Sequence, residues 1–159
     1  MSENDRVTLS ASGGLRAPGR IVTAPYPGFP TDAQPVLMAA LLRAEGESVF
    51  VENIFENRYR QVPELRKLGA RIQLAGREAR ITGVERLHGA MLRATDLRGG
   101  AAMVLAGLAA EGETLVLDEG HITRGYEELD GCLCSLGAEL TLTHEGENNG
   151  LYIQETESV

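Results

Sequence analysis

Ala44-Glu-Gly-Glu-Ser48 returns later in the chain as Ala110-Glu-Gly-Glu-Thr114, and this repetition decides the fold class. Each segment ends an apolar run, and a Thr-Asp pair opens each run, at Thr31-Asp32 and at Thr95-Asp96. Self-similarity at a fixed period indicates tandem copies of one supersecondary unit, and this period exceeds that of the common solenoid repeats. The chain is therefore predicted to contain one unit twice.

Each copy reads as strand, helix, strand, helix, strand, strand, which predicts an α/β fold. The expected elements are lead strands at 19–23 and 90–94, strands at 49–52 and 115–118, short helices starting at 57 and 123, and hairpins over 71–82 and 139–153. We expect two repeat units, about 19–85 and 90–154, in one partial domain at 19–159. Residues 1–18 are interpreted as a partly frayed remnant of a preceding unit, with a candidate strand at 7–10.

The first helix of each copy is apolar nearly all round, as Val36-Leu-Met-Ala-Ala-Leu-Leu42 and Ala101-Ala-Met-Val-Leu-Ala-Gly-Leu-Ala-Ala110 show. A helix without a polar face is expected to be buried on all sides. The second helix of each copy keeps charged residues, among them Glu64 and Glu127, and is expected nearer the surface.

Asp32 ends the proline-rich loop Pro25-Tyr-Pro-Gly-Phe-Pro-Thr-Asp32. The prolines fix φ and bias the residues before them away from helix, so the loop is pre-organised. An acid at the end of a rigid loop can act as a general base. It can also cap the following helix by accepting backbone N–H groups, and the sequence leaves both interpretations open.

Arg58 and Arg124 are predicted at the starts of the short helices, and Arg98 follows Asp96 at the start of the second apolar helix. A cation at a helix N-terminus opposes the helix dipole, which is unfavourable unless an anion occupies the site. Arginine binds carboxylate and phosphate through paired hydrogen bonds. The repeated placement predicts an anionic ligand, and the alternative is surface arginines paired with the abundant acids.

Several segments, in matching order from about Val7 to Leu140, resemble the UDP-N-acetylglucosamine enolpyruvyl transferase family. They are Thr23-Ala-Pro-Tyr-Pro-Gly-Phe-Pro-Thr-Asp-Ala-Gln34, Ile54-Phe-Glu-Asn-Arg58, Ala94-Thr-Asp-Leu-Arg98 with Val104-Leu-Ala-Gly107, and His121-Ile-Thr-Arg-Gly-Tyr-Glu127. The resemblance implies part of an enolpyruvyl-transferase-like inside-out α/β barrel domain. The shikimate-pathway enolpyruvyl transferase is related, but the Pro-Gly-Phe-Pro-Thr-Asp segment resembles the amino-sugar branch.

The resemblance implies transfer of enolpyruvyl from phosphoenolpyruvate to the 3′-hydroxyl of UDP-N-acetylglucosamine in peptidoglycan synthesis, without a cofactor. Asp32 matches the acid that takes the hydroxyl proton. Asp96 matches an acid beside the phosphoenolpyruvate site that orients partners and shares in proton transfer. The residues that match the segment near the uracil are Ile54 and Phe55. The residues that match arginines around phosphoenolpyruvate are Arg58, Arg98 and Arg124.

Members of this family are more than twice as long and have two domains of three such units each. The match covers two units of the C-terminal part, and it includes neither the family's lid cysteine nor its phosphoenolpyruvate-binding lysine. Thr123 also stands where the family most often has aspartate. We therefore expect the chain alone to be inactive and to self-associate or bind the missing N-terminal half. Two alternatives stay open: a non-catalytic module that binds a nucleotide sugar or a protein, and one half of a split enzyme.

The net charge of −8 at pH 7 argues against nucleic acid as a partner, because phosphate backbones bind basic surfaces. The apolar helices are too short to cross a bilayer and no signal peptide is recognised, so we expect a cytoplasmic protein without membrane contact. Cys132 and Cys134 lack further ordered ligands and are interpreted as structural thiols, so no metal site is expected.

Overall fold

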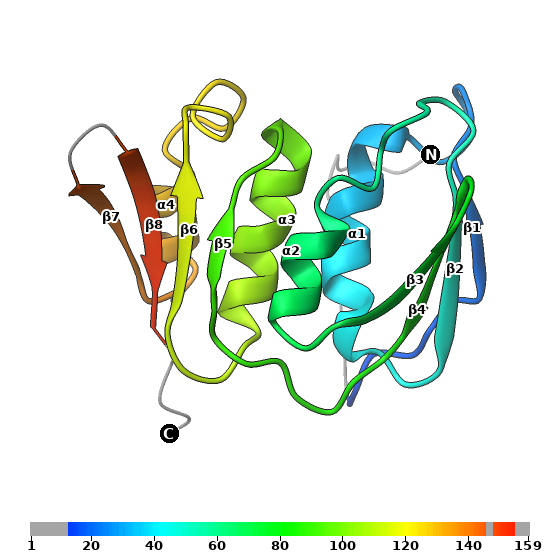
Figure 1. The fold of residues 1–159 in the computed structure, drawn as a ribbon, viewed down its shortest axis with the longest axis horizontal. Coiled ribbons are helices and arrows are strands. Elements are labelled where there is room, and N and C mark those ends of the chain that lie inside the picture. Colours follow the sequence, from blue (N-terminus) through cyan, green and yellow to red (C-terminus); the bar gives the residue numbers. More distant parts are fainter. Residues whose placement is uncertain (1–12, 146–147, 155–159) are drawn as a thin grey trace, which may run out of the picture.

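The computed structural model describes residues 13–145 and 148–154. Its strands are β1 (Arg20–Val22), β2 (Glu47–Val51), β3 (Arg71–Ala75), β4 (Glu78–Thr82), β5 (Met91–Arg93), β6 (Thr114–Asp118), β7 (Leu140–Glu145) and β8 (Asn148–Ile153). They form two sheets with equivalent strand orders, β1-β2-β4-β3 and β5-β6-β8-β7 (Figure 1). In each sheet the first two strands are parallel and the other neighbours are antiparallel. The predicted α/β class is confirmed.

The helices join these sheets into one core. α1 (Gln34–Ala40), which continues as the 3-10 turn η2 (Leu41–Arg43), packs against α3 (Leu97–Leu108). The two helices lie side by side in the middle of the molecule, with one sheet on each flank (Figure 1). α2 (Val62–Lys67) contacts β5 of the other sheet, and α4 (Leu129–Ser135) contacts β7. We refer to β1–β4 with α1 and α2 as the first unit, and to β5–β8 with α3 and α4 as the second.

Prolines set where the helices of the first unit begin. Pro35 and Pro63 lie in the first turns of α1 and α2, where the missing N–H has no helical partner to lose. α2 therefore begins at Val62 and not at residue 57 as the sequence analysis predicted. α4 likewise begins at Leu129 and not at residue 123, directly after Glu128, whose φ of 47° is left-handed.

The core is most complete around α3. Most of this helix is buried, and its small residues allow close packing: a Cβ on Gly107 would lie 2.8 Å from the Cδ1 atom of Ile153. α1 differs from the prediction. Met38 and Ala39 are buried, but Ala40 is exposed and Leu37 is half-buried. Burial on all sides is therefore right for most of α3 and wrong for α1, which packs against α3 along one face.

Some expectations fall outside the described residues. These include the candidate strand at 7–10, most of the expected remnant at 1–18, and residues 155–159 of the tail. The division into 1–18 and 19–159 stays a prediction. Within residues 13–145 and 148–154, no helix has the length and apolar character needed to cross a membrane.

Candidate active site

Asp32 connects loops from both units at one end of the molecule. Its Oδ1 atom accepts a hydrogen bond from Arg58 Nη2 at 3.0 Å, and its Oδ2 atom accepts one from Arg98 Nη2 at 3.1 Å. The three residues follow β1, β2 and β5, so they gather at the carboxyl ends of parallel strands. The side chain of Asp32 is 57% exposed, against 15% for Arg58 and 30% for Arg98. Two guanidinium groups around one carboxylate leave a net positive charge, which favours an anionic ligand.

The loop before Asp32 is held tightly by its own backbone. Gly28 N–H donates to Pro25 C=O at 2.8 Å, and Ala24 N–H donates to Phe29 C=O at 3.0 Å. A Cβ on Gly28 would lie 2.5 Å from the Cβ of Ala24, so only glycine fits at this position. The loop therefore holds Asp32 on a rigid backbone.

Asp32 does not cap α1. It lies in the 3-10 turn η1 (Thr31–Ala33), and the N-cap position of α1 is Ala33, without a side-chain cap. Asp32 therefore lies inside the turn and not at its N-cap, and its carboxylate is hydrogen-bonded to the two arginines. The capping alternative is therefore wrong for this residue.

Capping occurs instead at Asp96. Its Oδ1 atom accepts hydrogen bonds from Arg98 N–H at 3.1 Å and Gly99 N–H at 2.8 Å. These bonds satisfy two of the free N–H groups at the start of α3. Asp96 thus fixes the backbone from which Arg98 reaches Asp32, while its catalytic role stays a prediction.

The helix-dipole argument fails for Arg58 and Arg124. Both lie in turns that precede α2 and α4, and the dipole effect is confined to the first turn of a helix. Arg58 is held instead by Asp32, by Thr31 C=O at 3.1 Å and by the ring of Phe55, whose centroid is 5.7 Å away. Arg98 does lie in the first turn of α3.

Arg124 is not brought into this cluster. It is exposed, and its Nη2 atom lies 3.5 Å from Nδ1 of His121. The described residues include no hydrogen bond or ion pair between Arg124 and Asp32, Arg58 or Arg98. The predicted convergence of three arginines is thus seen for two of them.

Two residues that the sequence analysis did not single out support the cluster. Tyr126 accepts a hydrogen bond from Arg98 Nη1 at 3.1 Å, and the guanidinium lies 5.5 Å from the centre of its ring. This hydrogen bond, followed by the one to Asp32, raises the pKa of Arg98 above its ordinary value. Tyr126 stands in the quoted segment 121–127, so the resemblance could have indicated it.

Glu52 is the second such residue and is almost completely buried. Its Oε1 atom accepts from the Thr23 hydroxyl at 2.9 Å and from the N–H groups of Ile54 at 2.8 Å and Phe55 at 3.1 Å. Its Oε2 atom accepts from the Thr31 hydroxyl at 2.9 Å. One carboxylate therefore ties the Asp32 loop to the loop that carries Ile54 and Phe55. An acid at the end of a strand was the only sequence signal for this role.

Two hollows flank the cluster. One, of about 430 Å³, is bordered by Asp32 together with the exposed side chains of Tyr26, Ile54 and Phe55. The other, of about 280 Å³, lies between Asp96 and the segment from Phe55 to Arg60 and includes Arg58. The first combines apolar surface with a carboxylate, and the second has two arginines, Arg58 and Arg60, together with the carboxylates of Glu56 and Asp96.

The described residues contain no group of three or more His, Cys, Asp or Glu side chains that could hold a metal ion. Cys132 and Cys134 are free and exposed on α4, away from the cluster. Neither cysteine is part of the core, Cys134 Sγ donates to Leu140 C=O at 3.4 Å, and the interpretation of both as structural thiols stays a prediction.

A comparison of the sequence with known families matches residues 3–133 to the EPSP synthase (3-phosphoshikimate 1-carboxyvinyltransferase) family. The chain belongs to this family. Among enolpyruvyl transferases of known structure, NikO from Streptomyces tendae superposes with a TM-score of 0.72 at 36% identity, over 79% of this chain and 29% of NikO. An EPSP synthase from Acinetobacter baumannii superposes with a TM-score of 0.55 at 25% identity. The expected enolpyruvyl-transferase-like fold is confirmed.

Within the family, the resemblance to the amino-sugar branch is also confirmed. The UDP-N-acetylglucosamine 1-carboxyvinyltransferase of Desulfofundulus thermocisternus is 56% identical over 87% of this chain and 56% of that protein. The enzyme of that name from Novosphingobium aromaticivorans is 55% identical over 84% of this chain and 31% of that protein. The chain thus spans between about a third and about half of these relatives' length.

Proposed function

We propose that this chain is the C-terminal portion of a UDP-N-acetylglucosamine 1-carboxyvinyltransferase. The reaction is transfer of the enolpyruvyl group of phosphoenolpyruvate to the sugar 3′-hydroxyl, with release of phosphate. The observation that carries the proposal is Asp32 held between Arg58 and Arg98, at the carboxyl ends of parallel strands, in a chain 56% identical to an enzyme of that name.

In the ligand-free protein both oxygens of Asp32 are engaged by arginines. The carboxylate and phosphate of phosphoenolpyruvate together carry more negative charge than the single carboxylate of Asp32, so they compete with it for the two arginines. When they take Arg58 and Arg98, Asp32 is released to accept the proton of the sugar hydroxyl. The sugar oxygen then adds to C2 while the π electron pair takes up a proton from solvent at C3. Loss of a proton from C3 returns an electron pair that re-forms the double bond, the bond from C2 to the phosphate oxygen breaks, and phosphate leaves with that bond's electrons.

In this proposal each of the two hollows binds one of the two substrates. The apolar side chains of Ile54 and Phe55 lie against the uracil, beside Asp32. The hollow that contains Arg58 and Asp96 receives phosphoenolpyruvate. Arg124, which lies in an exposed turn, approaches the phosphate when the ligand is bound.

We further propose the biological setting that the relatives' reaction implies. The protein acts in the cytoplasm in cell wall biogenesis, and so in cell shape and the cell cycle. It works together with the N-terminal half of such an enzyme, and its repeat units at 19–85 and 90–154 form part of one domain.

The test is titration of the chain with phosphoenolpyruvate, followed by amide chemical shifts. Arg98→Ala should weaken binding, because one guanidinium is lost, whereas Asp32→Asn should not weaken it, because the competing carboxylate is gone. Arg20→Ala, which removes an exposed arginine paired with Glu78, is the matched control. No binding, or equal binding by Arg98→Ala, would overturn the proposal.

A second candidate is a non-catalytic module that binds a nucleotide sugar. The open setting favours it, since Tyr26, Phe55 and Asp32 all face solvent. Phosphate release decides between the two when the chain is mixed with the separately produced N-terminal half of a relative. Release that Asp32→Asn abolishes supports the transferase, and its absence despite binding of both substrates supports the module. The chain by itself is expected to release no phosphate.

A further inference from the structure

A buried pair of glutamine side chains lies where the three segments that carry Asp32 and its two arginines meet. Gln34 begins α1 two residues after Asp32, and Gln61 precedes α2 three residues after Arg58. Both glutamines are fully buried. Gln61 also lies against the start of α3, since a Cβ on Gly99, directly after the second arginine, would be 3.2 Å from its own Cβ.

The two amides share one hydrogen-bond acceptor, the thioether sulfur of Met38 in α1. The Nε2 atoms of Gln34 and Gln61 each donate to this sulfur at 3.8 Å. A thioether is a weak acceptor, so these bonds contribute less than bonds to oxygen would. They nevertheless join the start of α1 to the start of α2 through a single atom.

The oxygens of the same amides have no partner. In the part of the chain that the structure describes, the buried Oε1 atoms of Gln34 and Gln61 accept no hydrogen bond, and the buried Nε atom of Arg58 donates none. Turning either amide over would only exchange the atom that lacks a partner, because the sulfur cannot donate. A buried polar atom without a partner lowers stability. Stability alone therefore does not account for amides at these two positions.

We propose that Gln34 and Gln61 are positioning residues for Asp32 and Arg58. By sharing one sulfur, the two amides hold the start of α1 at a set distance from the start of α2. Directional hydrogen bonds define such a distance, whereas apolar side chains of similar volume can pack in more than one way. This inference rests on the proposed function for the identity of the ligand, phosphoenolpyruvate, but not for the positions of Asp32 and Arg58.

The double variant Gln34→Met, Gln61→Met separates positioning from stability. Methionine keeps the unbranched shape of glutamine and removes the unpartnered oxygens, so the midpoint of urea unfolding should not fall. The Arg58 guanidinium should nevertheless rotate faster in the free chain, which nitrogen exchange in NMR spectra measures, because its bonds to Thr31 and Asp32 are weakened. Phosphoenolpyruvate should bind at least about fivefold more weakly, the equivalent of about one net hydrogen bond.

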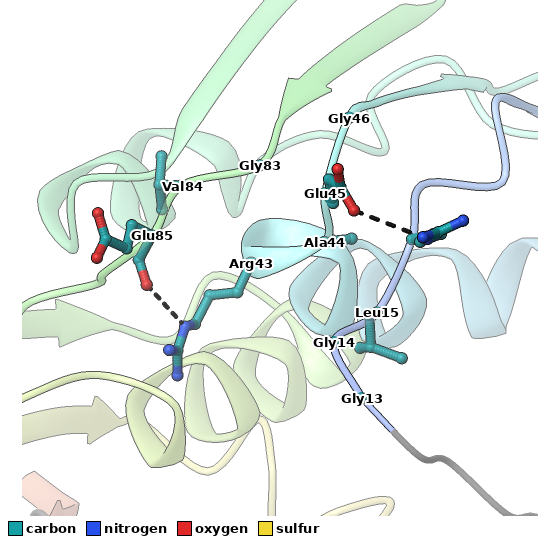
Figure 2. Close-up of a pocket in the computed structure, with 11 residues that line it drawn as sticks. Gly13, Gly14, Leu15, Arg43, Ala44, Glu45, Gly46, Gly83, Val84 and Glu85 are labelled. Carbon is teal, nitrogen blue, oxygen red and sulfur yellow. Dashed lines mark hydrogen bonds and ion pairs between the residues drawn. The ribbon is translucent and has the colours of Figure 1, made fainter.

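Two matched controls change comparable groups away from the cluster. Ser48→Ala removes another buried hydroxyl without a partner, near the start of β2, and should leave guanidinium rotation and binding unchanged. Arg43→Met acts at the opposite end of α1, where Arg43 donates to the C=O groups of Glu85 and Ala109 at 3.3 and 3.4 Å; Figure 2 shows the first of these bonds. This variant loses a link between the two units, and it should also leave rotation and binding unchanged.

A third variant decides the question if the double variant does not fold. Met38→Leu keeps a similar side-chain volume and both glutamines but removes their shared acceptor, so rotation of Arg58 should again become faster. Unchanged rotation or binding in the double variant, or a fall in its urea midpoint alongside these changes, would overturn the inference. Unchanged rotation in Met38→Leu, or equal effects in Ser48→Ala, would do the same. If the original chain binds no phosphoenolpyruvate, the proposed function fails, and rotation of Arg58 in the free chain still decides the positioning role.

Discussion

The buried carboxylate of Glu52 offers the sharpest test of how the site is held. Its Oε1 atom accepts three hydrogen bonds, from Thr23, Ile54 and Phe55, and its Oε2 atom accepts one, from Thr31. In Glu52→Gln, the carbonyl oxygen can take the place of Oε1, and the amide can donate to the Thr31 hydroxyl. The variant then loses only the contribution of the charge, about 1–2 kcal/mol of unfolding free energy.

Glu52→Ala removes all four bonds and leaves their donors without this acceptor, which should cost about 3–5 kcal/mol. For a chain of this size, that corresponds to a fall in Tm of roughly 6–20 °C, against roughly 2–8 °C for glutamine. Urea denaturation gives the free energies. Amide spectra should show the Ile54 and Phe55 signals moving in both variants.

The matched control is Glu119→Ala, which removes an exposed partner of Arg93 and should change the unfolding free energy by less than about 0.5 kcal/mol. Two results would refute the reasoning. An alanine variant within about 1 kcal/mol of the original chain would mean that the four bonds contribute little. Equal losses for glutamine and alanine would mean that the amide cannot adopt the orientation described.

Three further predictions concern the scaffold. Gly83→Ala should destabilise the protein by at least about 3 kcal/mol in urea denaturation, because the added Cβ would lie 1.7 Å from the backbone oxygen of Ala44; a loss below 1 kcal/mol would contradict this. Asp96→Ala should cost about 0.5–2 kcal/mol and expose the first N–H groups of α3, which hydrogen exchange would detect, whereas unchanged exchange would contradict the cap. Burial, followed by the charge of Glu52, raises the pKa of Tyr59, so its contribution to stability is complete below the unfolded pKa of about 10 and is lost as pH rises towards the higher folded pKa. Denaturation between pH 9 and about 11 should show a decline that is shallower in Tyr59→Phe, and equal slopes would contradict the assignment.

The succession of strands and helices along the chain could be predicted from the sequence, because the same segments recur in both copies and mark where each element begins and ends. Lead strands expected at 19–23 and 90–94 are found at Arg20–Val22 and Met91–Arg93. The helix starts could not be placed as well. The repeat pattern predicted starts at the arginine-bearing turns, whereas Pro63 lies in the first turn of α2 and the left-handed Glu128 precedes α4. A proline in the first helical turn, as Pro63 is, is the sequence signal that indicates the start of α2.

The candidate site was harder to predict because its contacts join segments far apart in the chain. Asp32, Arg58 and Arg98 were each selected from local patterns or from the family resemblance, but only the packing of α1 against α3 brings Arg98 to Asp32. The supporting side chains gave weaker signals. Glu52 looks like an ordinary acid at a strand end, and Tyr126 forms its hydrogen bond with a residue of another loop.

The different roles of the two Thr-Asp pairs follow from the residues after them. Asp96 precedes Leu97, the first residue of α3. Its Oδ1 atom therefore accepts hydrogen bonds from N–H groups in the first turn and caps the helix. Asp32 lies inside the 3-10 turn that leads into α1 and not at the N-cap position, so its carboxylate remains available. One copy of the repeat therefore orients Arg98, and the other presents the acid that this arginine meets. A site between the units needs this asymmetry, since two capping aspartates would leave Arg58 and Arg98 without a carboxylate between them.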